Sequence, residues 1–262
     1  MSQWEVLDGL HIGCVQYLNS RPLIHGLQGV RLAHPRLLAD ELRSGELDVA
    51  LVPVFELLRA PQAYIAVDGV AIASEGPVYS VFVAHEHPLG ALKGVVADPA
   101  SLTSIHLFQV LSKGALGLDL PLLEGGDSAA LGEHGQLWIG NQALAFRQKY
   151  AGEGMQFWDL GEAWTAWTGL PFVYAVWVLR RGLPEAERVA EAFRDVAKAA
   201  VASIPGIAAG EVDFGPGVAL EYLTRNIRFA MGALEKAGLD RFRSELVARG
   251  FLPQSETGLD FV

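Results

Sequence analysis

Short apolar runs alternate with amphipathic stretches through the first two thirds of the chain. The runs are rich in Val and Ile, and most are bounded by Gly, Pro or Asp, a pattern typical of β-strands. Helical patterns lie between the runs, and this alternation favours an α/β fold with largely parallel sheets. The predicted strands are 10–15, 47–52, 69–74, 78–84, 93–97, 137–140 and 172–179.

The helices are predicted from apolar residues that recur at spacings of three and four. Pro35 can open one helix, and Gly45 can end it. Another follows Asp98-Pro99-Ala100-Ser101, a segment crowded with residues that cap helices. In the last third, the same spacing predicts three amphipathic helices, at 184–203, 217–236 and 239–250.

The order of these elements indicates two lobes. The strand-like runs 78–85 and 172–179 bracket a long middle segment. One run can carry the chain into a second lobe, and the other can carry it back. We therefore predict a discontinuous first lobe at 1–84 plus 177–262, a second lobe at 85–176, and a cleft between them.

The composition limits the partners of this chain. Hydrophobic residues make up 51% of the 262 residues, which is enough to bury a sizeable core. The net charge of −10 argues against nucleic acid as a partner, because phosphate binding needs a basic face. An anionic small molecule stays compatible with this charge, since a few local donors can hold it.

The sequence also indicates a compartment. Cys14 is the single cysteine and lies in an apolar strand, where a buried structural thiol is expected. The first residues lack the basic region and the long apolar run of a signal peptide. The most apolar run, 170–179, is too short to span a membrane. We therefore expect a cytoplasmic protein without membrane contact, and the oligomeric state stays open.

Polar residues gather where several predicted strands end. Tyr17-Leu18-Asn19-Ser20-Arg21-Pro22-Leu23 follows the first strand directly, and Gly140-Asn141 follows a later one. Ser80 interrupts the apolar strand that begins near Val78. Ligands bind at the carboxyl ends of strands in open α/β sheets, so these positions are candidate binding loops. Two alternatives stay open: a buried Ser80 satisfied within the core, and an Asn141 that only shapes its turn.

Three hydroxyls lie at a predicted helix start, on Ser101, Thr103 and Ser104. The first turn of a helix has unpaired N–H groups and positive dipole potential, which together favour a carboxylate or phosphate. Helix capping would account for one of the three hydroxyls. We therefore predict an anion-binding turn here, with plain capping as the alternative.

Other chemical signatures are weak or missing. The sequence has no phosphate-loop or dinucleotide glycine pattern and no Gly-x-Ser-x-Gly elbow. His85-Glu86-His87 looks like a set of metal ligands, but Pro88 follows and no third ligand is close. We expect neither a metal nor another cofactor. Glu75 and His106 lie near the candidate loops, but neither is predicted to be an essential base.

These segments together resemble the chorismate dehydratase family of the futalosine route to menaquinone. The most specific are Tyr17-Leu18-Asn19-Ser20-Arg21-Pro22-Leu23 and Trp167-Thr168-Gly169-Leu170-Pro171-Phe172. Gly140-Asn141 is a departure, because the family more typically reads Gly-Asp there. The resembling stretches cover nearly the whole chain, at 12–23, 42–53, 73–81, 101–107, 140–144 and 158–177.

The resemblance implies a two-lobed, type II periplasmic-binding-protein-like fold with an interlobe cleft. It also implies a cytoplasmic enzyme that converts chorismate to 3-[(1-carboxyvinyl)oxy]benzoate and water. On this basis we predict Asn19 and Ser80 as catalytic residues. The predicted substrate-binding residues are Tyr17, Ser20, Ser101, Thr103, Ser104, Asn141 and Tyr174.

The implied reaction ends in an aromatic ring, so the protein need only position the substrate and stabilise developing charge. The candidate residues include no convincing base, and we predict that a substrate carboxylate takes the proton. Asn19 would orient that carboxylate, and Ser80 would hydrogen-bond the substrate. Two alternatives are a sister enzyme of the 1,4-dihydroxy-6-naphthoate synthase type and a non-catalytic cytoplasmic solute-binding protein.

Overall fold

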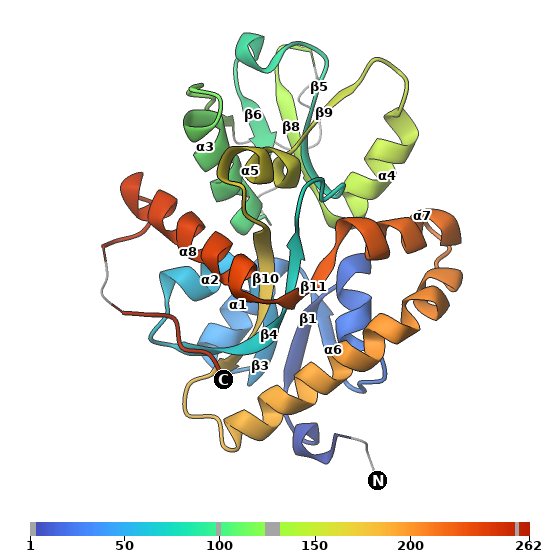
Figure 1. The fold of residues 1–262 in the computed structure, drawn as a ribbon, viewed down its shortest axis with the longest axis vertical. Helices are drawn as coiled ribbons and strands as arrows, with labels where there is room; N and C mark the ends of the chain where they lie inside the picture. Colours follow the sequence, from blue (N-terminus) through green and yellow to red (C-terminus); the bar gives the residue numbers. More distant parts are fainter. Residues whose placement is uncertain (1–3, 98–100, 124–131, 255–256) are drawn as a thin grey trace.

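Two β-sheets, one above the other along the long axis of the molecule, organise the fold (Figure 1). The computed structural model describes residues 4–97, 101–123, 132–254 and 257–262. The six-stranded sheet, in spatial order, consists of β11 (Arg228–Met231), β4 (Tyr64–Ser74), β10 (Phe172–Arg180), β3 (Val49–Pro53), β1 (Ile12–Val15) and β2 (Arg31–Ala33). The five-stranded sheet consists of β7 (Leu122–Leu123), β6 (Val95–Ala97), β8 (Gly135–Ile139), β5 (Val81–His85) and β9 (Gln156–Asp159).

Both sheets are mixed, so the prediction of largely parallel sheets is wrong. β1 pairs in parallel with β2 and β3, and β6 pairs in parallel with β7 and β8. In contrast, β10 runs antiparallel to β3 and β4, and β5 runs antiparallel to β8 and β9. These antiparallel strands occur where the chain changes sheets. β4 leads into β5, and β10 brings the chain back.

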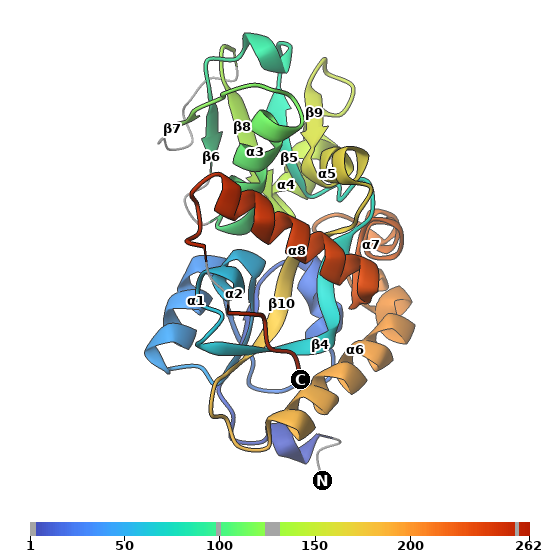
Figure 2. The ribbon, with the colours of Figure 1, turned by 60° about the vertical axis from the view of Figure 1, so that its left-hand side comes forward.

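Helices flank both sheets (Figure 1). Beside the six-stranded sheet lie α1 (Pro35–Ser44), α2 (Val54–Arg59) and α6 (Ala186–Ala209). Beside the five-stranded sheet lie α3 (Thr103–Gly114), α4 (Gly140–Tyr150) and α5 (Leu160–Thr168). α8 (Ala233–Ala248) packs on both β10 and α3, and Figure 2 shows it crossing in front of the junction. The other helical segments of the described residues are α7 (Pro216–Glu221), a π-helical turn at Tyr222–Asn226 and short 3-10 turns at Glu5–Leu7, Leu18–Ile24 and Leu89–Ala91. Among the described residues, no helix combines the length and apolarity needed to cross a membrane.

One predicted helix is wrong. α1 and α6 lie where helices were predicted, and α1 ends at Gly45, which adopts φ +83°. The predicted helix at 217–236 instead contains α7, a π-helical turn, β11 and the start of α8. Ile227 and Met231 are both buried, and their spacing of four fits a helix and an alternating strand equally well. Asp98-Pro99-Ala100, predicted to open a helix, lies outside the described residues.

Of the strands in the described residues, the pattern did not predict β2, β7, β9 and β11, and each of these lies at an edge of its sheet. An edge strand is covered on fewer sides, so it needs no continuous apolar run. β2, for example, has two exposed residues out of three. The six-stranded sheet takes its strands from 12–74 and 172–231, and the five-stranded sheet from 81–159. The lobe boundaries 1–84, 85–176 and 177–262 stay a prediction.

Candidate active site

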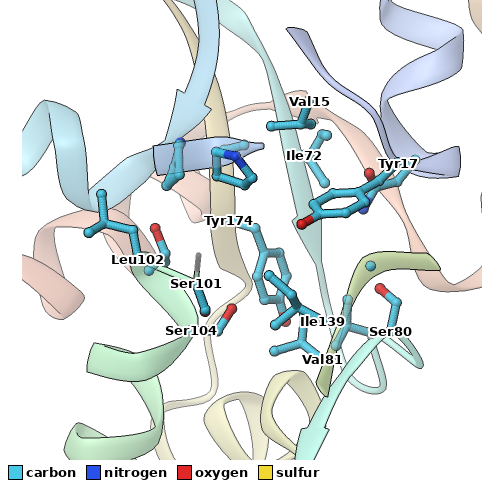
Figure 3. A pocket seen from close by; sticks show the side chains of 17 residues that line it. Val15, Tyr17, Ile72, Ser80, Val81, Ser101, Leu102, Ser104, Ile139 and Tyr174 are labelled. Carbon is cyan, nitrogen blue, oxygen red and sulfur yellow. The ribbon is translucent and has the colours of Figure 1, made fainter. Parts of the chain in front are cut away.

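A pocket lies between the two sheets, where the amino-terminal ends of several helices meet (Figure 3). The space between its walls, counted together with the open solvent at its mouth, is about 560 Å³. Ser20 and Asn141 do not line the pocket. The predicted site residues that do line it are Tyr17, Asn19, Ser80, Ser101, Thr103, Ser104 and Tyr174.

Ser20 and Asn141 shape the turns behind the pocket. Ser20 Oγ donates to the backbone oxygens of Val15 and Tyr17, at 2.5 and 2.7 Å, and so closes the first turn on itself. Asn141 Oδ1 accepts the backbone N–H of Leu18 at 2.8 Å, which ties that turn to the start of α4. An aspartate would supply the same acceptor, so the Gly-Asn departure from the family's Gly-Asp pattern keeps this bond available.

Tyr17 packs closely against Gly140, the first residue of α4. Gly140 has φ +59°, and a Cβ on it would lie 2.5 Å from Cδ1 of the Tyr17 ring. Both the backbone conformation and the contact therefore require glycine. Figure 3 shows the Tyr17 ring reaching over the pocket from the first turn.

A buried tyrosine, which the sequence reasoning missed, connects the two predicted catalytic residues. The hydroxyl of Tyr222 accepts an N–H from Asn19 Nδ2 at 3.0 Å and lies 2.7 Å from Ser80 Oγ. Tyr222 is 2% exposed, and burial raises the pKa of its phenol above the ordinary value, so the phenol stays protonated. It opens the π-helical turn Tyr222–Asn226, inside the segment predicted as a continuous helix. The one sequence signal available was a polar tip on a large ring, which needs a partner when buried.

The first turn of α3 forms another wall of the pocket. Ser101 Oγ is buried and has no hydrogen-bond partner among the described residues. Thr103 Oγ1 accepts the backbone N–H of Phe55 at 3.2 Å, in the first turn of α2. No side-chain hydrogen bond caps α3 at Leu102, and the helix whose first turn Thr103 satisfies is α2. An unpaired hydroxyl and the first N–H groups of α3 are left for a ligand.

The electrostatics of the pocket favour an anion without supplying a full positive charge. Pro35, Thr103 and Gly140 are the first residues of α1, α3 and α4, and all three line the pocket. Helix amino termini carry partial positive charge. Of the described residues that line the pocket, none has a charged side chain. The site is therefore a neutral, hydroxyl-rich pocket in a positive field.

An acidic residue holds the loop that presents Ser80. Asp159 is 2% exposed, and its carboxylate accepts the backbone N–H groups of Val78 and Tyr79 at 3.0 and 2.8 Å. The same carboxylate caps the amino terminus of α5. Arg147 lies 3.3 Å from this carboxylate and 4.2 Å from the centre of the Tyr79 ring. Tyr79 adopts φ +69°, which is costly for a non-glycine residue, and these contacts hold it there.

Tyr174 contributes a buried hydroxyl to the pocket. Its OH lies 3.1 Å from Ser74 Oγ, and burial raises its pKa well above the ordinary value. Gly161 makes room for it, because a Cβ there would lie 2.6 Å from the Tyr174 oxygen. Tyr174 is therefore a neutral group at the site.

The two titratable residues considered near the loops lie away from the pocket. Glu75 pairs with Arg228. The ring of His106 stacks on Phe55 with centroids 3.7 Å apart, and Nδ1 donates to the backbone oxygen of Leu102 at 2.8 Å. Burial lowers the pKa of His106. Neither residue lines the pocket.

The amino-acid sequence matches a known protein family. A family model described as menaquinone biosynthesis matches residues 10–248. The chain belongs to this family. A curated relative from Thermus thermophilus, named chorismate dehydratase, is 29% identical over 90% of this chain and 94% of its own length. Both matches confirm the resemblance to chorismate dehydratases that the motifs predicted.

Solved structures confirm the predicted fold class of this protein, the periplasmic-binding-protein-like fold. A protein from Archaeoglobus fulgidus aligns with a TM-score of 0.72 at 13% identity, over 93% of this chain and 98% of its own. A Candida albicans protein with the generic periplasmic binding protein fold gives 0.62 at 13% identity, over 94% and 92%. The periplasmic aliphatic sulphonate binding protein of Escherichia coli gives 0.63 at 15% identity, over 94% of both chains. At these identities the likeness shows the fold alone.

Proposed function

We propose that this protein is a chorismate dehydratase, a carbon–oxygen lyase that converts chorismate to 3-[(1-carboxyvinyl)oxy]benzoate and water. Its place would be the futalosine route to menaquinone, in the cytoplasm. The family match and the name of the Thermus thermophilus relative support this proposal. The name of that relative and the chemistry of the pocket support the proposed substrate and reaction class.

The observation that carries the proposal is the neutral pocket at three helix amino termini. Chorismate carries two carboxylates, a ring hydroxyl and an apolar diene ring. Hydroxyls such as Ser101 and Ser104, together with the N–H groups of α3, suit a carboxylate. Ile72, Val81 and Ile139 offer apolar contacts to the ring. The pocket therefore matches a small dianion with an apolar face.

The reaction requires little from the protein beyond position and charge stabilisation. A ring carbon loses its proton, and the C–H electron pair becomes the new ring double bond. The adjacent C–O bond breaks, and its electron pair leaves with the hydroxyl oxygen. The ring proton and this hydroxide combine as water, so atoms and electrons balance without a redox partner.

The proton needs a temporary acceptor, and the pocket offers no ionised side chain among its described lining residues. We assign this role to the carboxylate of the substrate's enolpyruvyl arm. Asn19 orients this carboxylate, and Ser80 hydrogen-bonds the hydroxyl that leaves. Tyr17 and Tyr174 complete the walls as neutral binding groups. The division of the chain into lobes at 1–84 plus 177–262 and at 85–176 stays part of the proposal, since closure of the lobes would exclude water.

Chorismate turnover by a panel of variants tests this assignment. Asn19→Ala is expected to lower turnover by roughly a hundredfold or more, because it removes a group that contacts the reacting atoms. Glu75→Gln and His106→Ala are matched controls that remove titratable groups near the loops, and both are expected to keep turnover. If either control abolishes turnover while the protein still folds and binds chorismate, a protein base acts and the substrate-base mechanism is wrong.

The likeness to the Escherichia coli sulphonate binding protein also fits a protein that binds an anion without converting it. Saturable chorismate binding with no product would favour that function. Neither binding nor turnover of chorismate would favour a sister enzyme with another substrate.

A further inference from the structure

Tyr222 touches both residues that the proposed function places at the reacting atoms, yet it does not line the pocket itself. We propose that Tyr222 is a positioning residue that sets the direction of hydrogen bonding at the site. In this arrangement Asn19 presents its carbonyl oxygen to the substrate, and Ser80 presents its hydroxyl proton. The inference rests on the proposed function and goes beyond it in two ways. It adds a third residue to the site, and it gives a proton order, by which we mean which group donates to which along Asn19, Tyr222 and Ser80.

The proton order follows from counting donors. The oxygen of Tyr222 accepts one proton from Asn19 Nδ2, at 3.0 Å. The phenol has a single proton of its own, and at 2% exposure that proton needs a partner inside the protein. Ser80 Oγ, at 2.7 Å, is the acceptor within reach. Ser80 Oγ therefore accepts a hydrogen bond from Tyr222. The proton of the Ser80 hydroxyl is then available to donate to a ligand in the pocket that Ser80 lines.

The same order determines what Asn19 offers. Tyr222 accepts one of the two Nδ2 protons, and the other can hold the ionised carboxylate, whereas Oδ1 is buried without a hydrogen-bond partner among the described residues. A buried acceptor without a donor is costly, so Oδ1 is prepared for a ligand that carries a proton. A carboxylate becomes such a ligand once it has taken the ring proton. The acceptor of Asn19 therefore stabilises the carboxylic acid formed during the reaction, while the Ser80 proton stabilises the departing hydroxyl.

The backbone around this chain of hydrogen bonds is fixed on both sides. The backbone oxygen of Ser80 accepts the N–H of Gly140 at 2.9 Å. At the far end of the π-helical turn, Asn226 Nδ2 donates to the backbone oxygen of Pro77 at 2.9 Å. π-Helical turns occur frequently at functional sites, where the extra residue re-aims a side chain. Here the turn directs Tyr222 toward Ser80, in the loop between β4 and β5.

Tyr222→Phe tests the inference, because it keeps the ring and removes the oxygen. We expect kcat for chorismate to fall roughly tenfold or more while KM changes less than about threefold. In a Ser80→Ala background the same substitution should have a smaller effect, because Tyr222 acts through Ser80. Tyr64→Phe is the control. It removes the hydroxyl of another buried tyrosine, which donates to Glu56 at a distance of 2.9 Å. Neither Tyr64 nor Glu56 lines the pocket, so kcat should stay unchanged.

An unchanged kcat in Tyr222→Phe, or an equal loss with and without Ser80, would overturn the inference. NMR of the Asn19 side-chain amide gives a reading that needs no turnover. These amide proton signals should shift in Tyr222→Phe, and unmoved signals would also overturn it. If they shift while the wild-type protein leaves chorismate unchanged, the proposed function fails and the hydrogen-bond order stands.

If Tyr222→Phe does not fold, NMR of the wild-type protein tests the inference instead. Its Tyr222 hydroxyl proton should exchange slowly and show a nuclear Overhauser effect to Ser80, and the absence of this signal counts against the proposal.

Discussion

The backbone N–H of Leu18 donates to the side-chain oxygen of Asn141 at 2.8 Å. Leu18 follows β1 of the six-stranded sheet, and Asn141 lies in the first turn of α4 beside the five-stranded sheet. One side-chain hydrogen bond thus joins the two halves of the pocket wall. The bond requires an acceptor at position 141, and asparagine and aspartate both provide one.

Asn141→Ala should therefore destabilise the protein, whereas Asn141→Asp should not. The alanine variant leaves the buried Leu18 N–H without its acceptor, which costs about 1–3 kcal/mol of unfolding free energy. Urea unfolding of the wild-type protein and both variants checks the expectation. Equal losses in the two variants would show that position 141 needs the amide itself rather than an acceptor.

Gly140→Ala should be more harmful than Gly152→Ala. Both glycines have positive φ, at +59° and +86°, so both alanines carry a backbone cost of about 1–2 kcal/mol. Gly152 has nothing within 4 Å of an added Cβ, whereas at Gly140 the Cβ would strike the Tyr17 ring. We expect a further loss of about 1–3 kcal/mol and a raised KM for chorismate in Gly140→Ala only. If the two variants have the same unfolding free energy and the same KM, Tyr17 does not pack against Gly140 as described.

Asp159→Asn should destabilise the loop that presents Ser80. In the asparagine, one of the two oxygens that now accept the N–H groups of Val78 and Tyr79 becomes an NH2 group, which cannot accept, and the Arg147 charge loses its partner. A loss on the order of 3 kcal/mol in unfolding free energy is expected. Asp119→Asn is the control, since that side chain is 92% exposed and 3.9 Å from Lys113, and it should change stability little. A small effect at Asp159 would contradict its structural role.

Cys14 should be inert in the folded protein. Burial raises the pKa of its thiol to about 12, so the reactive thiolate is almost absent at pH 8. Because the unfolded chain ionises at a lower pH, this contribution to stability is complete below the unfolded pKa and is lost as the pH rises toward 12. A thiol reagent at pH 8 should label Cys14 in urea but not under native conditions. Rapid labelling of the native protein would show that the strand is open to solvent.

The central part of each sheet could be predicted from the sequence, and the edges could not. β1, β3 and β10 are apolar throughout or nearly so, because neighbours cover both sides, and their runs indicate strands directly. The edge strands leave no such run, because two of three residues are exposed in β2 and only one of four is fully buried in β9. At β11 the alternation of a strand coincides with helical spacing, which hid the strand within a predicted helix.

The candidate site divides in the same way. Asn19, Ser80 and Ser101 could be proposed from short motifs at strand ends and helix starts, since those positions converge in an open α/β fold. Tyr222 lies far from them in sequence, and a π-helical turn determines its direction. Ser20 belongs to the predicted motif, but its hydroxyl closes the turn instead of facing the pocket. Local patterns therefore indicate which loops form the site, whereas the partner of each side chain depends on tertiary contacts.

The most direct test of this account is to incubate the purified protein with chorismate, without added metal or cofactor, and to identify the products by mass spectrometry. We expect a product that has lost one water and carries an aromatic ring, the 3-enolpyruvyl ether of benzoate, formed faster than in a protein-free control. Unchanged chorismate in a demonstrably folded sample would contradict this expectation.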